Sequence, residues 1–550
     1  MNETANQELG QVPVRKLMAR FAIPCIMSLL VSALYNIVDQ IFVGRGVGYL
    51  GNGATNVVFP VTVITLAFAL AIGDSCAAFL SLCQGQQDTE NAHRSVGNAV
   101  TLTVLVSLLL TAIFAVGRDG CLAAFGATEA NRAYAVEYFT YLLPGIPFYM
   151  FGTAMNSVIR ADGSPAFAML STLVGCVMNV ILDPIAIFAL QMGMKGAALA
   201  TISGQIVTAL MAIWYLAKKN KAFRLKRASF HLSGHLLRRF LPLGISSFIT
   251  QVSIVAIMAA MNNVLVIYGA KSPYGADIPM TVVGIVMKVF QIVVAIVVGI
   301  AAGCQPLVGY NYGAGHIDRV RQILKTMMAA EIAVGLVSLL CFQMFPRQIT
   351  ALFGSGDALY EEFAVMAFRI FLCTIPLCCV QKAGSIFLQS LGRPLEAMSL
   401  SLLREIVLSI PLAILLPMFF GVTGTLYSAP VADAISCTIT VVILTRVIGA
   451  TNYSQKTIYI SEASATLHEF GHFLDWTLGI PAKHEQLYLA EAQNSGLRDY
   501  AKTNAREYFA DSFDYWIAYS GSEKRMETFR NAAPQTWAYF EALEKNNWRS

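Results

Sequence analysis

Two histidines and a glutamate near the C-terminus are spaced to bind and use a metal ion. Residues 466–478 contain the run His468-Glu469-Phe-Gly-His472, and on a helix the two histidines face the same way, one turn apart. Both imidazoles can therefore reach one Zn²⁺, and Glu469 can act as the base that polarises its water. Glu507 follows His472 by 35 residues in a second helical stretch, where it is placed as the third ligand. The pattern predicts zinc-dependent hydrolysis.

Three further side chains belong to the same hypothesis or lie beside it. Asp511 comes one helical turn after Glu507 and can orient a ligand histidine from outside the metal's own ligands. Tyr500 can donate a hydrogen bond to the oxyanion of a tetrahedral intermediate. His484 is expected to be a surface residue. The competing interpretation is a soluble helix with exposed His and Glu side chains.

A second set of polar residues lies inside apolar stretches of the chain. A charge at the centre of a bilayer costs several kcal/mol unless it is paired or hydrated, so Asp39 needs a reason to be there. Asn179 and Asp183 are one helical turn apart and share a face. With Thr201, these two carboxylates, the amide and the hydroxyl suit a proton or a hard cation such as Na⁺. The alternative for Asp39 and Asp183 is a place at a span end, in the interface.

The second half of the apolar region offers weaker candidates for the same role. These are Lys288, Glu405 and Asp433. Lys288 can balance a carboxylate or extend to the interface. Glu405 follows Arg404 near the start of a span, which favours a local ion pair.

Composition places these residues in two different bodies. The chain has 550 residues, of which 56% are hydrophobic and only 13% charged. An average soluble domain carries about 25% charged residues, so an ordinary cytosolic enzyme, a disordered chain and a secreted disulfide scaffold are excluded. The last 100 residues differ, with 13 Asp or Glu and 10 Lys or Arg. We expect a tail over 1–15, two membrane lobes over 16–217 and 240–450 joined by a linker over 218–239, and a small soluble domain over 451–550.

The apolar region predicts an all-α polytopic membrane protein with twelve spans. They cover roughly 18–43, 54–82, 95–117, 134–158, 166–191, 196–217, 240–269, 279–304, 324–346, 359–388, 398–418 and 422–445. Residues 218–239, between the sixth and seventh spans, carry eight Lys or Arg and no acid. The positive-inside rule makes this segment cytoplasmic. Both chain ends and the C-terminal domain are then cytoplasmic, and no cleavable signal peptide is expected.

The spans also repeat. Ile159–Pro165 and Leu388–Pro394 share a Gly-x-Pro turn with a basic residue, 229 positions apart, and each precedes a similar helix start. The spacing predicts two parallel copies of six spans, an architecture that transporters use, with a substrate site near the midplane. Chance similarity between apolar helices is the alternative.

Residues 10–450 resemble the multidrug and toxin extrusion (MATE) transporters. The stretches that carry the resemblance are Tyr35–Gly44, Arg160–Pro165, Asn179–Pro184, Gly196–Thr201, Gly313–Arg321 and Leu391–Pro394. The resemblance implies two six-helix lobes around a V-shaped cavity in the inner membrane of a prokaryote. It implies export of small amphipathic, cationic compounds in exchange for H⁺ or Na⁺, and a coupling site at Asp39, Asn179, Asp183 and Thr201. Ion binding at Asp39 and Asp183 would bend span 1 and change which side of the cavity is open.

We further expect a monomer in contact with membrane lipid, with no nucleic-acid partner. The alternative function is a lipid or lipid-linked sugar flippase of a related superfamily. Such flippases keep more basic residues in the cavity, where this sequence offers mainly Lys288.

Residues 464–545 resemble the catalytic domain of anthrax lethal factor and its relatives, which are zinc peptidases. Tyr500, Glu507, Phe509-Ala510, Phe513 and Asn531–Pro534 carry the resemblance together with the histidine motif. It implies His468, His472 and Glu507 as zinc ligands, Glu469 as general base, Tyr500 as transition-state donor and a peptide as the substrate of a small, mostly helical zincin-like domain. Those domains place a β-sheet before the metal helix, whereas here only Lys456–Ser461 precedes it.

Three interpretations of the fusion remain open: a natural two-function protein, a recombined gene that kept half of a peptidase, and an artefact of assembly. Because the sheet is missing, we weight the last two above an active peptidase. A regulated transporter, with the domain acting as a zinc sensor, is a further alternative.

Overall fold

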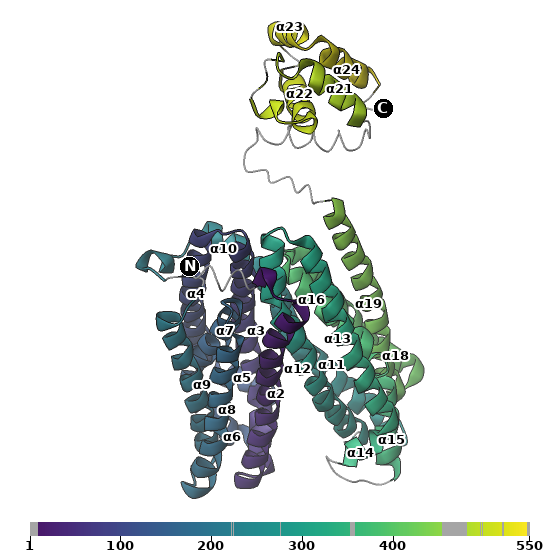
Figure 1. Ribbon diagram of the computed structural model, residues 1–550. Coiled ribbons are helices and arrows are strands. Elements are labelled where there is room, and N and C mark those ends of the chain that lie inside the picture. Colours follow the sequence, from purple (N-terminus) through teal and green to yellow (C-terminus); the bar gives the residue numbers. More distant parts are fainter. Residues whose placement is uncertain are drawn as a thin grey trace. The chain divides into compact units, whose positions relative to one another are not determined.

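The computed structural model describes residues 9–221, 223, 225–275, 277–351, 358–453, 481–495, 497, 499–519 and 522–546; for 49, 448–453, 481–482, 499–500, 518–519 and 523–524 it describes the backbone alone. Most of the described residues are helical, and no β-strand occurs among them (Figure 1). They divide into two compact units, Met1–Ile448 and Gly449–Ser550, and each is described by itself.

The first half of the membrane unit forms the N-lobe. Its long apolar runs fold as helices because in lipid every backbone N–H and C=O must be satisfied within the segment. The elements are α2 (Val14–Gly46), α3 (Tyr49–Gly85), α4 (Thr89–Val116), α5 (Arg118–Ala124), α6 (Glu129–Leu142), η1 (Leu143–Gly145), α7 (Ile146–Ala161), α8 (Pro165–Pro184), the π-helical η2 (Ile185–Ala189) and α9 (Gly193–Lys218).

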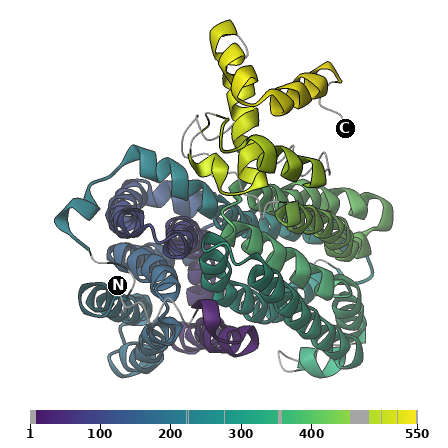
Figure 2. The same ribbon diagram turned by 45° about the horizontal axis from the view of Figure 1, so that its top comes forward.

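The second half forms the C-lobe, which follows a linker whose described part includes the 3₁₀ turn η3 (Arg227–Phe230). Its elements are α10 (Gly234–Phe240), η4 (Leu241–Gly244), α11 (Ile245–Gly269), α12 (Asp277–Gly313), α13 (Ile317–Met344), α14 (Pro346–Ala351), α15 (Ala358–Phe371), α16 (Ile375–Ser390), α17 (Pro394–Leu402), the π-helical η5 (Leu403–Leu408), α18 (Ser409–Phe420) and α19 (Val422–Tyr453). Figure 2 shows the two lobes as bundles side by side, the N-lobe mostly purple to blue and the C-lobe mostly teal to green.

Eleven continuous helical segments of the described chain are long and apolar enough to cross a membrane. The pair α15 and α16, bent by 45° at its break, makes a twelfth when counted as one span. The chain is therefore a multi-pass membrane protein, in line with the twelve predicted spans. Exposed leucines such as Leu108, Leu109 and Leu340 lie on the outside of the bundles, where lipid replaces water as the solvent.

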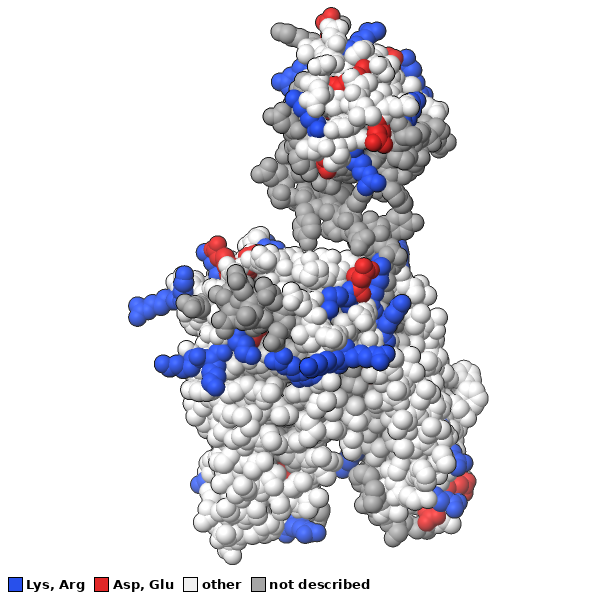
Figure 3. All heavy atoms as spheres, in the orientation of Figure 1, with Lys and Arg blue, Asp and Glu red and all other residues white. Residues whose placement is uncertain are grey.

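The lobes join at one end and separate at the other. Figure 3 shows Lys and Arg gathered around one end of the membrane unit, the upper end in this view, and a cleft between the lobes at the opposite end. We call the first the basic end. There the N-terminal half of α2 belongs to the C-lobe core, since Leu17 and Phe21 pack with Leu307 and Phe387. Further along α2, Val43 belongs to an N-lobe core.

The internal repeat has the same local structure in both copies. α7 ends at Ala161 and α8 begins at Pro165, and α16 ends at Ser390 and α17 begins at Pro394. Between each pair lies a glycine in the left-handed region, Gly163 with φ 77° and Gly392 with φ 76°. Only glycine adopts this conformation without strain, which explains the recurrence of Gly-x-Pro.

The second unit contains α21 (Pro481–Glu491), η7 (Asp499–Lys502), α22 (Ala505–Tyr519), α23 (Glu523–Ala532) and α24 (Pro534–Lys545). Aromatic side chains such as Phe509, Trp516 and Phe540 form its core. The buried Glu491 carboxylate caps α24 by accepting hydrogen bonds from the backbone N–H groups of Gln535 and Thr536, both at 2.8 Å. Burial raises the pKa of Tyr508 to about 12, and its hydroxyl lies 2.9 Å from that of Thr536.

Candidate functional site

Two carboxyl groups from different helices of the N-lobe contact each other. Asp39 comes from α2 and Asp183 from the last turn of α8, and their side chains share a hydrogen bond. Asp183 is completely buried and Asp39 is half-buried. Because a carboxylate can only accept, a hydrogen bond between two carboxyl groups requires a proton on one of them. One oxygen of each group, Oδ1, has no hydrogen-bond partner in the described chain, so the pair can take a further proton or a cation.

Asp183 lies where the regular helix α8 ends. Pro184 lacks an N–H and follows it directly, and the chain continues as the π-helical turn η2. Such a turn places successive side chains differently from an α-helix and is frequent at functional sites. The buried Asp183 therefore lies at an irregular helix end.

The predicted partners Asn179 and Thr201 complete this group. The Asn179 amide can take two orientations. In one, Nδ2 donates to Thr201 Oγ1 at 3.4 Å. In the other, Nδ2 donates to Asp183 Oδ2 at 3.2 Å and the oxygen accepts from the Thr201 backbone N at 3.3 Å. Tyr138 on α6, which sequence reasoning missed, lies beside Thr201 and the two carboxyl groups. The structure thus brings together all four residues predicted for ion coupling.

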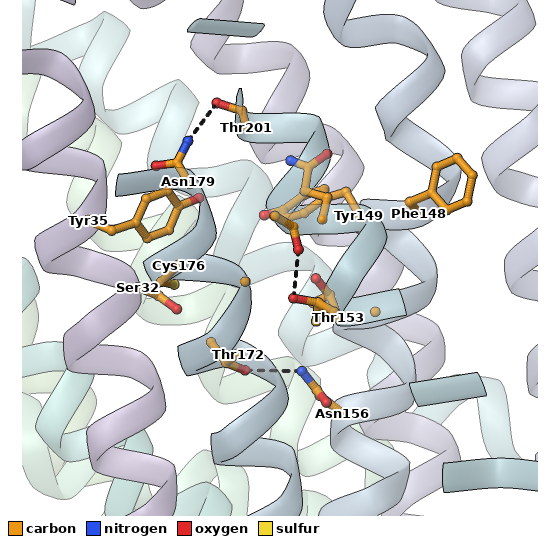
Figure 4. A pocket seen from close by; sticks show the side chains of 15 residues that line it. Ser32, Tyr35, Phe148, Tyr149, Thr153, Asn156, Thr172, Cys176, Asn179 and Thr201 are labelled. Atoms are coloured by element: carbon orange, nitrogen blue, oxygen red, sulfur yellow. Dashed lines mark hydrogen bonds between the residues drawn. The ribbon is translucent and has the colours of Figure 1, made fainter. Parts of the chain in front are cut away.

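A pocket opens beside this group and shares two of its residues. It encloses about 530 Å³, open solvent included, and Asn179 and Thr201 form part of its wall. Figure 4 shows Tyr35, Asn179 and Thr201 at one side of it. Its lining contains no charged side chain; it consists of aromatic, amide, hydroxyl and small residues: Ser32, Tyr35, Phe148, Tyr149, Gly152, Thr153, Asn156, Thr172, Gly175, Cys176, Asn179, Thr201, Gly204, Gln205 and Thr208. Aromatic faces with convergent polar groups suit an amphipathic ligand, and they attract cations.

The candidate residues of the C-lobe have a different arrangement. Glu405 and Asp433 are both buried and face the buried Arg404, whose Nη1 lies 2.6 Å from Glu405 Oε1 and whose Nε lies 2.9 Å from Asp433 Oδ1. Lys382 Nζ adds a contact of 3.0 Å to Glu405 Oε1. The expected local pair of Arg404 and Glu405 is confirmed. The two carboxylates are thus balanced by two cations, whereas no Lys or Arg of the described chain pairs with Asp39 or Asp183.

Lys288 lies apart from these carboxylates. Its side chain is exposed on α12, and among the described residues it forms no ion pair. Sequence reasoning also missed Glu331, a completely buried residue of α13 whose two carboxyl oxygens have no hydrogen-bond partner in the described chain. The signal that could have identified Glu331 was its charge within the ninth predicted span, residues 324–346.

The predicted metal site falls mostly outside what the structure describes. His468, Glu469 and His472 lie outside the described residues, and of Tyr500 only the backbone, in η7, is described. Glu507 is half-buried in the first turn of α22, and Asp511 is buried one turn later. Within the described ranges no three His, Cys, Asp or Glu side chains form a metal cluster. The zinc site stays a prediction from the sequence.

The expectation of a surface position for His484 was wrong. Its ring is 2% exposed, stacks on Phe509 at 4.2 Å between centroids, and lies 2.9 Å from the Tyr539 hydroxyl through Nε2. The aromatic partners come from α22 and α24, far along the chain, so local sequence gave no sign of them.

Two family models match the chain. The MatE model matches residues 24–185 and 247–415. The model named "Anthrax toxin lethal factor, N- and C-terminal domain" matches residues 438–543, which confirms the second resemblance. The first match covers more than half of the chain and both lobes.

Curated relatives and solved structures point the same way. The multidrug export protein MepA of Staphylococcus aureus (strain MRSA252) is 23% identical over 426 residues, 77% of this chain and 92% of that protein. MepA of Staphylococcus haemolyticus is 24% identical, covering 76% and 91%. The solved structure of the MATE multidrug transporter DinF-BH is 31% identical with a TM-score of 0.73, covering 79% and 96%. The chain therefore belongs to the MatE family, the MATE transporters.

Proposed function

We propose that the membrane unit exports small amphipathic, cationic compounds in exchange for H⁺ or Na⁺, and that the Asp39–Asp183 pair is where the ion acts. The observation that carries this is a shared wall: Asn179 contacts Asp183, Thr201 contacts Asn179, and both residues line the pocket. The negative charge of the carboxyl pair therefore attracts both a cation in the pocket and a proton or Na⁺ on the pair itself. Binding of one lowers the affinity for the other by a coupling free energy that is reciprocal.

The basic end is the cytoplasmic end in this proposal, because Lys and Arg concentrate in cytoplasmic loops. The cleft in Figure 3 then opens to the outside. In this arrangement the ion enters from outside, protonates or occupies the pair, and weakens the hold on the exported cation.

The test is transport by the full chain in proteoliposomes with an imposed pH or Na⁺ gradient. A fluorescent amphipathic cation is expected to move in the direction opposite to the flow of the ion. Its movement is expected to stop when the ion gradient is collapsed. Movement of a fluorescent phospholipid analogue without movement of the cation would instead support the flippase alternative. Comparing H⁺ with Na⁺ gradients identifies the ion.

For the C-terminal segment we propose a zinc site formed by His468, His472 and Glu507. Two nitrogens and a carboxylate are a donor set that suits Zn²⁺, and the family match over 438–543 supports it. Zinc supplies a Lewis acid and an activated water when bound. Glu469 would then hold the water's proton, and a peptide is the expected substrate.

The full chain is expected to carry about one zinc per molecule, measured by elemental analysis after dialysis. His468→Ala and Glu507→Gln are expected to lower the zinc content at least tenfold, and Glu469→Gln to leave it unchanged. The matched control is Glu527→Gln, an exposed glutamate of α23. Zinc content that none of these variants alters would contradict the site. If chelation changes transport while no peptide is cleaved, the domain is a sensor and not a peptidase.

A further inference from the structure

A polar cluster crosses from one lobe to the other near the basic end. Asp74 of α3 is its centre. Its Oδ1 accepts a hydrogen bond from Ser157 Oγ at 2.8 Å and lies 3.7 Å from Arg160 Nη2, both in the N-lobe. Its Oδ2 accepts from Ser247 Oγ at 2.9 Å, and Ser247 belongs to α11 of the C-lobe. Gln389 of α16 donates to the same Ser247 Oγ at 3.4 Å. One carboxylate thus has hydrogen-bond partners in both lobes.

The surrounding interface is closed backbone to backbone. A Cβ added at Gly85 of α3 would collide with the backbone of Tyr310 on α12 and of Ala314 just after it, and one at Gly313 would collide with that of Leu82. A Cβ at Gly244 would collide with the backbone of Ala71. At these points the two lobes are in direct backbone contact. The lobes must therefore separate here before the pocket can open toward the basic end.

Most contacts of the cluster lie within one lobe and persist when the lobes separate. Among its hydrogen bonds, the one from Ser247 to Asp74 joins the lobes, while those of Ser157 and Arg160 stay within the N-lobe. The Asp74 and Arg160 side chains are 17% and 19% exposed, so water can replace the serine when the lobes part. A hydrogen bond to a charged acceptor is roughly twice as strong as a neutral one. Its loss is enough to shift a two-state equilibrium about tenfold.

The two ends of the cluster also occupy equivalent places in the repeat. Arg160 and Gln389 are 229 positions apart, each three residues before the left-handed glycine that follows its helix. In the N-lobe copy the side chain is a cation that holds Asp74, and in the C-lobe copy it is an amide that holds Ser247. Each lobe thus contributes one supporting side chain from the same position.

We propose that Asp74, Ser247 and Gln389 form a latch that holds the basic end closed while the pocket is open at the opposite end, and that the transport cycle breaks and remakes the Ser247–Asp74 hydrogen bond. Asp74 and Ser247 are positioning residues: they set the balance between two arrangements of the lobes and do not touch the transported compound. The latch deepens the proposed transport function, because alternating access is what requires the lobes to part.

The test is hydrogen–deuterium exchange of the full chain in lipid nanodiscs, read on peptides covering the end of α3 and the end of α12. Ser247→Ala is expected to raise the exchange of these peptides about tenfold. The matched control is Ser157→Ala, which removes a hydrogen bond to the same carboxylate without crossing between lobes, and is expected to stay within about twofold of the wild type. Asp74→Asn, which keeps the shape and removes the charge, is expected to follow Ser247→Ala.

Equal exchange in the wild type and Ser247→Ala would overturn the latch, as would equal increases in Ser247→Ala and Ser157→Ala. Hydrogen–deuterium exchange reports on the contact between the lobes directly, and the measurement requires no exported compound. A protein that shows the expected exchange but moves no cation in proteoliposomes would therefore retain the latch and refute the proposed transport function. Where it does transport, Ser247→Ala is expected to change kcat more than KM, since the pocket residues are untouched.

Discussion

Asp39→Asn is expected to reduce ion-driven export at least tenfold, and Asp183→Asn to do the same. Each substitution keeps the shape of the side chain and removes the carboxylate whose charge both the ion and the cationic substrate use. An amide also cannot take up and release a proton at working pH. The measurement is the initial rate of efflux of a fluorescent cation from proteoliposomes at a fixed gradient, with the full chain reconstituted at equal density.

The control and the double variant make this prediction specific. Asp119→Asn removes an exposed carboxylate of the same lobe and is expected to leave the rate within about twofold. Because Asp39 and Asp183 share one hydrogen bond, they act as a unit, and the double variant is expected to be no worse than either single one. Export by Asp39→Asn with an unchanged dependence on the ion gradient would show that coupling occurs elsewhere.

The sequence predicted the parts of this site that depend on local spacing. Asn179 and Asp183 share a helix face because they are four residues apart, and a charge in an apolar span stands out by composition alone. Joining them to Asp39 and Thr201 required the family resemblance, since these residues lie on three different helices. Tyr138 could not be predicted as part of the site, because a tyrosine within a span does not indicate which residue it contacts.

The rest of the fold was predictable to different degrees. The positions of the spans follow from hydropathy. The repeat is visible in the sequence because Gly163 and Gly392 both adopt a left-handed conformation that favours glycine. The latch was not predictable, because Asp74 and Ser247 are 173 positions apart and meet only when the lobes pack. The irregular turn η5 was also hidden, since its residues read as ordinary helix formers.

The turn η5 explains how two consecutive charged residues can both be buried. In an α-helix, neighbouring side chains point about 100° apart. Arg404 and Glu405 nevertheless both face the inside of the C-lobe, at 8% and 6% side-chain exposure. The wider π turn that contains them changes the direction of successive side chains. Asp433 and Lys382 come from α19 and α16 to balance the charges.

This network predicts the largest effect on stability. Arg404→Ala is expected to destabilise the membrane unit by about 3–5 kcal/mol, because removing one member of a buried ion pair leaves its carboxylate partners uncompensated. The matched control is Arg393→Ala, which breaks a pair with Glu396 of similar length, 3.2 Å, whose side chains are 32% and 36% exposed. That change is expected to cost about 0–1 kcal/mol. The measurement is the folded fraction after heating, by size-exclusion chromatography in detergent.

A compensated variant separates lost charge balance from lost packing. Arg404→Met together with Asp433→Asn removes one charge of each sign and leaves the Lys382–Glu405 pair intact. It is expected to recover more than half of the stability lost in Arg404→Ala, since buried ion pairs contribute little compared with well-packed neutral groups. If the compensated variant were as unstable as Arg404→Ala, the guanidinium would act through its packing and its contact with Cys378 Sγ at 3.3 Å. If it is stable and still exports, the C-lobe carboxylates serve the fold, and ion coupling rests on the N-lobe pair.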